Sequence, residues 1–217
     1  MRAVRLVPTL LAALALAAPA HAQDAGEVIG RAARVYRDAG TIRADFTQVI
    51  DDRMVGTFES RGTLVQGQEG RLAMRFTDPK GDAIIVDGTS IWVYTPSTTP
   101  GQVLRLGVQA SPVYGANLLE RLLDRPAERY RTRYIRSDVL NGRPADVVEL
   151  VPLVPDMPFT KAVLWLDTAD ALPRRLEFSE RSGARRTLTL SRVRPNQGAP
   201  ASTFRFDVPS GVRVVTQ

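Results

Sequence analysis

The sequence predicts a mainly β fold with an α-helical lid: one large, curved, antiparallel sheet whose concave side is covered by helices. About a dozen short stretches rich in β-branched and aromatic residues alternate with turn residues from Thr41 onward. Only two segments show helical periodicity. Glycine tolerates the positive φ of tight turns, so three dipeptides between such stretches predict hairpins: Asp87-Gly88, Asn141-Gly142 and Ser182-Gly183.

The first 22 residues have the pattern of a secretory signal peptide. Arg2 and Arg5 precede an apolar run over residues 6–18, and small residues at 20 and 22 form a peptidase site. The apolar run is shorter than the ~20 residues that a membrane-spanning helix needs. We therefore expect cleavage after Ala22 and a single domain over residues 23–217, located in a bacterial periplasm.

The predicted mature chain contains neither histidine nor cysteine, because the only histidine, His21, leaves with the signal peptide. Ser-His-Asp and Cys-His catalysis are thereby excluded, as is a zinc site with His or Cys ligands. A disulfide and a cysteine-linked lipid anchor are excluded as well. We expect a protein that is not an enzyme and that has no cofactor and no metal.

Charge adds little to this prediction. The net charge of +6 falls to +4 on cleavage, because two arginines and no acidic residue are removed. A weak attraction to anionic headgroups is compatible with this value. The basic residues do not cluster with aromatic residues, so we expect no nucleic-acid partner.

The first half of the domain is predicted to be one helix followed by strands. In the helix, residues 26–39, apolar side chains recur at three- and four-residue intervals, and Gly40 stops it. Strands are predicted at 41–50, 54–66, 71–76, 83–86 and 89–94. Alternation places Leu72, Met74 and Phe76 on one face, with Arg71 and Arg75 opposite. Such a stripe is ordinary core more often than a ligand cavity, and the residue pattern alone favours core.

The second half begins with another apolar helix. Residues 112–124 carry Leu118, Leu119, Leu122 and Leu123 at helical spacing, with Pro112 suited to a first turn. Strands are then predicted at 129–137, 145–150, 161–167, 173–180, 185–193, 203–207 and 212–215. Two short helices are a small lid for so wide a sheet, which leaves room for a cavity as the alternative.

A series of motifs, in order along the chain, resembles the LolA family of periplasmic lipoprotein carriers: Ala44-Asp45-Phe46-Thr47-Gln48, Gly62-x-Leu64, Pro79, Asp87-Gly88, Ile91-Trp92-x-Tyr94 and Phe204-x-Phe206-x-x-Pro209-x-Gly211-Val212-x-Val214. The resemblance covers nearly the whole mature chain, including both predicted helices. It implies a half-open, unclosed β-barrel covered by helices, whose cavity holds the acyl chains of a lipoprotein. It also implies transfer by a monomer from an inner-membrane lipoprotein-releasing ABC transporter to an outer-membrane lipoprotein receptor.

Alternation and the resemblance together predict the binding residues. The predicted acyl-chain-binding residues are Leu64, Leu72, Met74, Phe76, Ile84, Val86, Trp92 and Tyr94, and the predicted lid residues are Leu118, Leu119, Leu122 and Gln68. The family commonly carries an Arg-Pro pair whose Arg is thought to hold the lid closed, where this sequence has Gln68-Glu69. Gln68 can still hydrogen-bond a lid carbonyl, less strongly than a guanidinium. This difference indicates a divergent member.

Three alternatives remain open at this point. The sequence fits a carrier of another lipid or glycolipid equally well. A periplasmic sensor of lipids or lipoproteins with the same fold is less favoured, because such regulators usually carry a second domain and the predicted mature length leaves no room for one. An enzyme would depend on paired carboxylates, and Asp51 with Asp52 and Asp167 with Asp170 are the candidates. Both pairs lie at predicted turns, where Asp is favoured because it hydrogen-bonds the local backbone.

Overall fold

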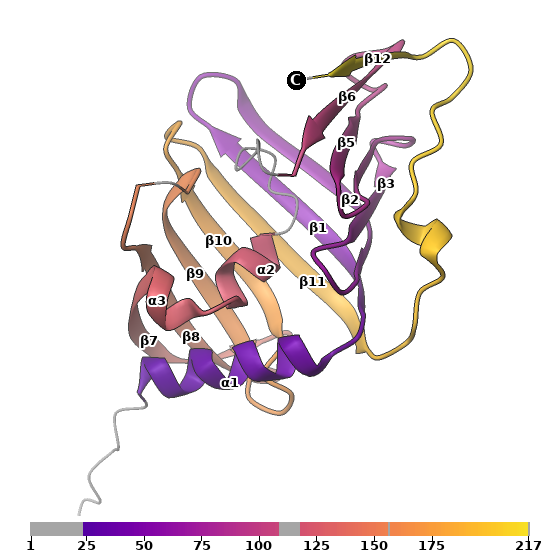
Figure 1. The fold of residues 1–217 in the computed structure, drawn as a ribbon. Coiled ribbons are helices and arrows are strands. Elements are labelled where there is room, and N and C mark those ends of the chain that lie inside the picture. Colours follow the sequence, from indigo (N-terminus) through magenta and orange to yellow (C-terminus); the bar gives the residue numbers. More distant parts are fainter. Residues whose placement is uncertain (1–23, 109–117, 156, 217) are drawn as a thin grey trace, which may run out of the picture.

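The computed structural model describes residues 24–108, 118–155 and 157–216, which form one sheet with helices on one face (Figure 1). The predicted signal peptide and residues 112–117 of the second predicted helix lie outside the described residues. The helices are α1 (Ala25–Asp38), α2 (Leu118–Leu123), α3 (Pro126–Arg129) and the 3-10 helix η1 (Ala201–Phe204). The strands are β1 (Ile42–Asp52), β2 (Gly56–Gln66), β3 (Leu72–Asp78), β4 (Ala83–Val86), β5 (Ser90–Tyr94), β6 (Gln102–Gly107), β7 (Tyr130–Leu140), β8 (Arg143–Pro152), β9 (Phe159–Asp167), β10 (Pro173–Glu180), β11 (Arg185–Pro195) and β12 (Arg213–Thr216).

The sheet is long, mostly antiparallel and unclosed, as the sequence predicts. Its 12 described strands follow the order β12-β6-β5-β4-β3-β2-β1-β11-β10-β9-β8-β7. Every neighbouring pair is antiparallel except β12 and β6, which run parallel. The predicted Asn141-Gly142 turn joins β7 and β8 with both residues at positive φ, as a tight hairpin requires.

The inner face of the sheet carries the main hydrophobic core, and α1, α2 and α3 lie over that face (Figure 1). Asp24 caps α1 by accepting a hydrogen bond from the backbone N–H of Gly26 at 2.9 Å. From α1, Ile29 and Ala32 are fully buried against the strands. The covered strands also contribute Phe46 from β1 and many aliphatic side chains. The helices therefore stabilise the sheet by removing one face from water.

The outer face of β2–β5 is covered by the chain that follows β11. Phe204 packs with Ala73 and Ile85, and Phe206 stacks on Trp92 with ring centroids 5.6 Å apart. The strand predicted at 203–207 is therefore wrong. Phe204 belongs to η1 and Phe206 to the extended segment after it. Both segments pack on the outer face and are not strands of the sheet.

Besides η1, two further elements were not predicted. Strand β6 is a short run between turn-rich segments, and α3 is a single turn that begins at a proline. The strand β6 completes the inner face on one side of the sheet, since Leu104 and Leu106 pack into the main core. It also provides the edge on which β12 pairs.

Candidate functional site

The inner face of β2–β4 brings six of the eight predicted binding residues together. In the strand register, Met74 lies opposite Leu64 on one side and Ile84 on the other. Phe76 meets Phe46 edge-on, with ring centroids 5.1 Å apart. All six pack in or against the main core: Leu64, Leu72, Met74, Phe76, Ile84 and Val86. The structure thus gathers them on one apolar surface, and their role in binding stays a prediction.

The predicted placement of Trp92 and Tyr94 on the inner face is wrong, because both side chains lie on the outer face. The Trp92 indole N–H donates to Asp87 at 2.8 Å, and the Tyr94 ring lies 5.5 Å from that of Phe206. In β5 the inward positions belong instead to Ile91 and Val93. The error has a simple origin: β5 is apolar on both faces, so its alternation does not say which face points inward.

The lid leucines fill the space above this inner face. Leu119, Leu122 and Leu123 are almost fully buried and share one core with Leu72 and Met74. The side chain of Leu118 lies outside the described residues, although its backbone belongs to α2. The inner face beneath these leucines is therefore packed against α2.

Polar contacts fasten α2 on the β7–β9 side. The Tyr130 hydroxyl donates to the backbone carbonyl of Arg121 at 3.1 Å, and Arg121 reaches the Met157 sulfur at 4.0 Å. At the end of α2, Asp124 pairs with Arg129 at 2.9 Å. These contacts anchor the lid to the strands on one side of the core.

Apolar side chains occur again on the inner face near the tip of the β1–β2 hairpin, beyond a polar row in which Gln48 donates to Ser60 at 3.3 Å and accepts from Arg186 at 3.3 Å. Residues four apart in a strand share a face, so Ile50 continues the inward row of Phe46, and Phe58 lies opposite Ile50. Phe58 is 54% exposed, and Met54 at the tip is 95% exposed. We call Met54, Val55 and Phe58 the hairpin tip. It lies at the end of the sheet opposite α1 (Figure 1).

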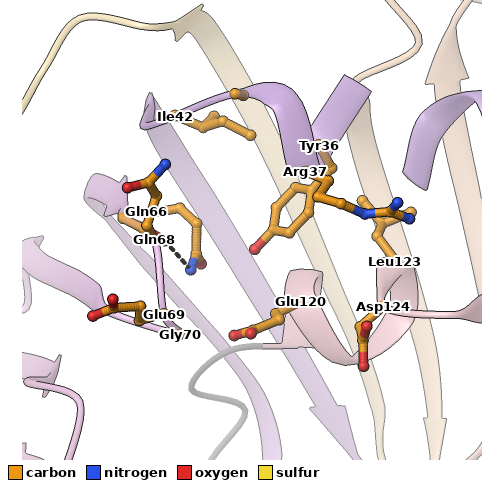
Figure 2. A pocket seen from close by; sticks show the side chains of 12 residues that line it. Tyr36, Arg37, Ile42, Gln66, Gln68, Glu69, Gly70, Glu120, Leu123 and Asp124 are labelled. Carbon is orange, nitrogen blue, oxygen red and sulfur yellow. Dashed lines mark hydrogen bonds between the residues drawn. The ribbon is translucent and has the colours of Figure 1, made fainter. Parts of the chain in front are cut away.

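A cavity of about 360 Å³ opens between the end of α1, the β2–β3 turn and α2 (Figure 2). Gln68, the predicted lid contact, lines it together with Tyr36 and Glu120. Burial, followed by the charge of Glu120, raises the pKa of the Tyr36 phenol, which therefore stays protonated. This cavity is polar, unlike the apolar interior beneath α2.

The candidate catalytic carboxylates have structural roles. Asp52 accepts backbone N–H bonds from Met54 and Val55 in the hairpin turn. Asp167 is 1% exposed and is ion-paired with Arg143 and with Arg174. Burial works to raise the pKa of Asp167, but hydrogen bonds from Arg143 and the backbone of residue 169 outweigh it and hold that pKa below its ordinary value.

Over 24–108, 118–155 and 157–216, no cluster of three or more His, Cys, Asp or Glu side chains could hold a metal ion. In the same ranges, no helix has the length and apolar character needed to cross a membrane.

Comparisons with known proteins agree with the fold. Residues 37–207 match the family model described as outer membrane lipoprotein carrier protein LolA. The chain is 26% identical to the outer-membrane lipoprotein carrier protein of Pseudomonas entomophila strain L48 over the whole of both chains. It is 28% identical to that of Pseudomonas aeruginosa strain PAO1, over 99% of this chain and 100% of the relative. An uncharacterized conserved protein from Thermus thermophilus superposes with a TM-score of 0.58 at 15% identity, covering 90% of this chain and 100% of that one.

Proposed function

The chain belongs to the LolA family of outer-membrane lipoprotein carrier proteins, and from this premise we propose that it carries lipoproteins across the periplasm with their acyl chains held on its inner face. The donor in this proposal is the inner-membrane lipoprotein-releasing ABC transporter, and the acceptor is the outer-membrane lipoprotein receptor. The observation that carries the proposal is the apolar inner face itself, covered by a short helix, with an exposed apolar hairpin tip farther along the sheet.

The physical need for such a carrier follows from the hydrophobic effect. Each acyl CH₂ group exposed to water costs about 0.8 kcal/mol, so a protein with several acyl chains does not leave a membrane unescorted. Met74 and the aliphatic residues around it offer a surface that adapts to chains of different length. Binding replaces the leucines of α2 with acyl groups, so the inner face keeps an apolar partner while the displaced leucines lose theirs.

The proposed activity requires no chemical step. Cargo binding displaces α2, and cargo release lets Leu119, Leu122 and Leu123 return to the core. A difference in acyl affinity between these two states is sufficient to drive transfer. We propose accordingly that the protein is a chaperone and not an enzyme.

The proposal is tested by lipoprotein release from spheroplasts. Purified protein is incubated with spheroplasts that retain outer-membrane lipoproteins, and lipoproteins in the supernatant are measured. Wild-type protein should release them as one-to-one complexes. Met74→Glu places a charge on the inner face and should abolish release, whereas Arg75→Glu, on the exposed opposite side of β3, should not.

A second inner-face variant separates loss of binding from loss of folding. Phe76 is only half-buried, so Phe76→Asp should keep the fold, as circular dichroism can verify, and should still impair release. Release by folded Phe76→Asp and Met74→Glu at the wild-type level would contradict the proposal.

A further inference from the structure

Exposed apolar side chains gather at one end of the sheet. Eight large apolar side chains of the described residues are exposed, and five of them lie at two connections between strands. Three of the five are the hairpin tip between β1 and β2. The other two, Leu153 and Val154, follow β8 and are 52% and 56% exposed. We call these five residues the apolar rim.

The directions of the strands bring both parts of the apolar rim to the same end. From β1 across β11, β10, β9 and β8, each strand runs antiparallel to its neighbour. The β1–β2, β10–β11 and β8–β9 connections therefore share the end of the sheet away from α1 (Figure 1). Neighbouring strands are about 4.8 Å apart, so roughly 15–20 Å separate the two apolar parts, with the β10–β11 turn between them.

Hydrogen bonds hold these connections in shape. The backbone N–H of Leu153 donates to the carbonyl of Arg129 at 2.9 Å. In the β10–β11 turn, Arg181 donates through Nε to the carbonyl of Met157 at 2.9 Å, which ties that turn to the β8–β9 connection. The hairpin turn is held by Asp52, as described above. Apolar side chains that ordered turns direct into solvent indicate a contact surface for a partner.

Basic side chains accompany the apolar rim and indicate the charge of that partner. Arg53 lies in the hairpin turn, and Arg181 and Arg185 lie at the two ends of the β10–β11 turn. All three are exposed, and none of them forms an ion pair with another described residue. These guanidinium groups favour an anionic partner surface.

The carboxylates of the same segments are engaged locally. Glu180 pairs with Arg186 at 2.7 Å, and Asp51 accepts a hydrogen bond from the Thr57 hydroxyl at 3.2 Å. Asp52 is used by the backbone of the hairpin turn. The three unpaired arginines are therefore the charges that this end offers to a partner.

We propose that the apolar rim docks the protein on the surface of an anionic phospholipid bilayer. The five apolar side chains would enter the headgroup region, and Arg53, Arg181 and Arg185 would meet lipid phosphates. A bilayer is continuous and deformable, so it accepts two separate apolar parts with a basic turn between them, and arginine keeps its charge at headgroup level. A protein partner would need two matching pockets at a fixed spacing. The inference goes beyond the proposed carrier function, which requires no direct contact with lipid.

Vesicle flotation tests the docking directly. The mature protein without cargo is mixed with vesicles of phosphatidylethanolamine and phosphatidylglycerol, or with vesicles of phosphatidylcholine alone. We expect the protein to float with the anionic vesicles and much less with the neutral ones. Added salt should weaken the binding to anionic vesicles, because it screens the arginines.

Fluorescent labels report which residues enter the lipid. The chain contains no cysteine, so a single introduced cysteine is labelled alone. An environment-sensitive dye on Met54→Cys or Leu153→Cys should shift to shorter wavelength when anionic vesicles are added. The same dye on Val139→Cys, at an exposed position at the opposite end of the sheet, should not shift.

Matched variants separate the apolar contribution from the charge contribution. Met54→Ser and Leu153→Ser should each weaken vesicle binding about tenfold, whereas Val139→Ser should bind as wild type. Arg185→Gln should weaken binding to anionic vesicles about fivefold. Its control is Arg194→Gln, at an exposed position near the other end of β11. Circular dichroism verifies the fold of each variant.

Three results would overturn the inference. The first is no binding of wild-type protein to either kind of vesicle, which would leave a protein partner for the apolar rim. The second is no dye shift at positions 54 and 153. The third is an equal loss of binding in the rim variants and in their controls. Protein that binds vesicles through the apolar rim but releases no lipoprotein from spheroplasts would retain this inference and contradict the carrier function.

Discussion

Leu122→Ala is expected to lower the stability of the fold while raising the proposed affinity for acyl chains. Leu122 is completely buried at the centre of the lid core. Its truncation removes three carbons, which at about 0.8 kcal/mol each amounts to about 2.4 kcal/mol of burial. With the cavity left behind, the free energy of unfolding should fall by about 2–5 kcal/mol. If cargo binding displaces α2 into water, the same truncation lowers the cost of that displacement.

The affinity for an acyl probe should therefore rise, by up to about 50-fold, since each 1.4 kcal/mol is a factor of ten. Urea unfolding measures the stability, and displacement of a fluorescent fatty-acyl probe measures the affinity. Leu172→Ala is the matched control, because Leu172 is equally buried but lies in the β9–β10 connection. It should lose stability and keep its affinity. Unchanged or weaker probe binding by Leu122→Ala would refute displacement of α2.

Three further predictions concern the hairpin tip, the buried ion pair and the outer face. Phe58→Asp should slow acyl-probe uptake in stopped-flow measurements, while the free energy of unfolding stays within about 0.5 kcal/mol of wild type. Val139→Asp, at an exposed position at the opposite end of the sheet, should leave uptake unchanged. Equal uptake by both variants would argue against a role of the hairpin tip in uptake. Asp167 has a lowered pKa in the folded state, so its stabilisation is complete above the ordinary carboxyl pKa and disappears as pH falls through the folded value. Asp167→Asn should cost about 2–3 kcal/mol at pH 7 in urea unfolding, and this cost should shrink progressively as the pH falls below the ordinary carboxyl pKa. A cost that does not change with pH would contradict this assignment. Trp92→Ala should lower the melting temperature because Trp92 stacks on Phe206, yet leave acyl-probe affinity unchanged; a loss of affinity would return Trp92 to the binding surface.

The face of β3 that points inward could be predicted from the sequence, because the side chains on its two faces differ chemically. Arginines at positions 71 and 75 alternate with Leu72, Met74 and Phe76, and the structure places Arg71 over the Phe204 ring on the outer face. Strand β5 could not be predicted in the same way. Its outer face is covered by a segment more than a hundred residues later, so both faces had to be apolar.

The cavity at the β2–β3 turn shows a second limit of the sequence. Gln66 looks like an ordinary polar strand end, and only the turn geometry brings the carbonyls of Gly67 and Arg71 to its amide nitrogen. That turn depends on Glu69 and Gly70, both at positive φ, and a non-glycine residue such as Glu69 gives little sequence signal for this conformation. Tertiary arrangement thus produced a cavity that no local pattern indicated.

Native mass spectrometry of the protein isolated from the periplasm of its own host tests the central claim most directly. The account predicts a one-to-one complex with a triacylated lipoprotein, which Met74→Glu loses and Arg75→Glu keeps. A protein that carries only free lipid or glycolipid, or that is empty in every preparation, would contradict a lipoprotein carrier.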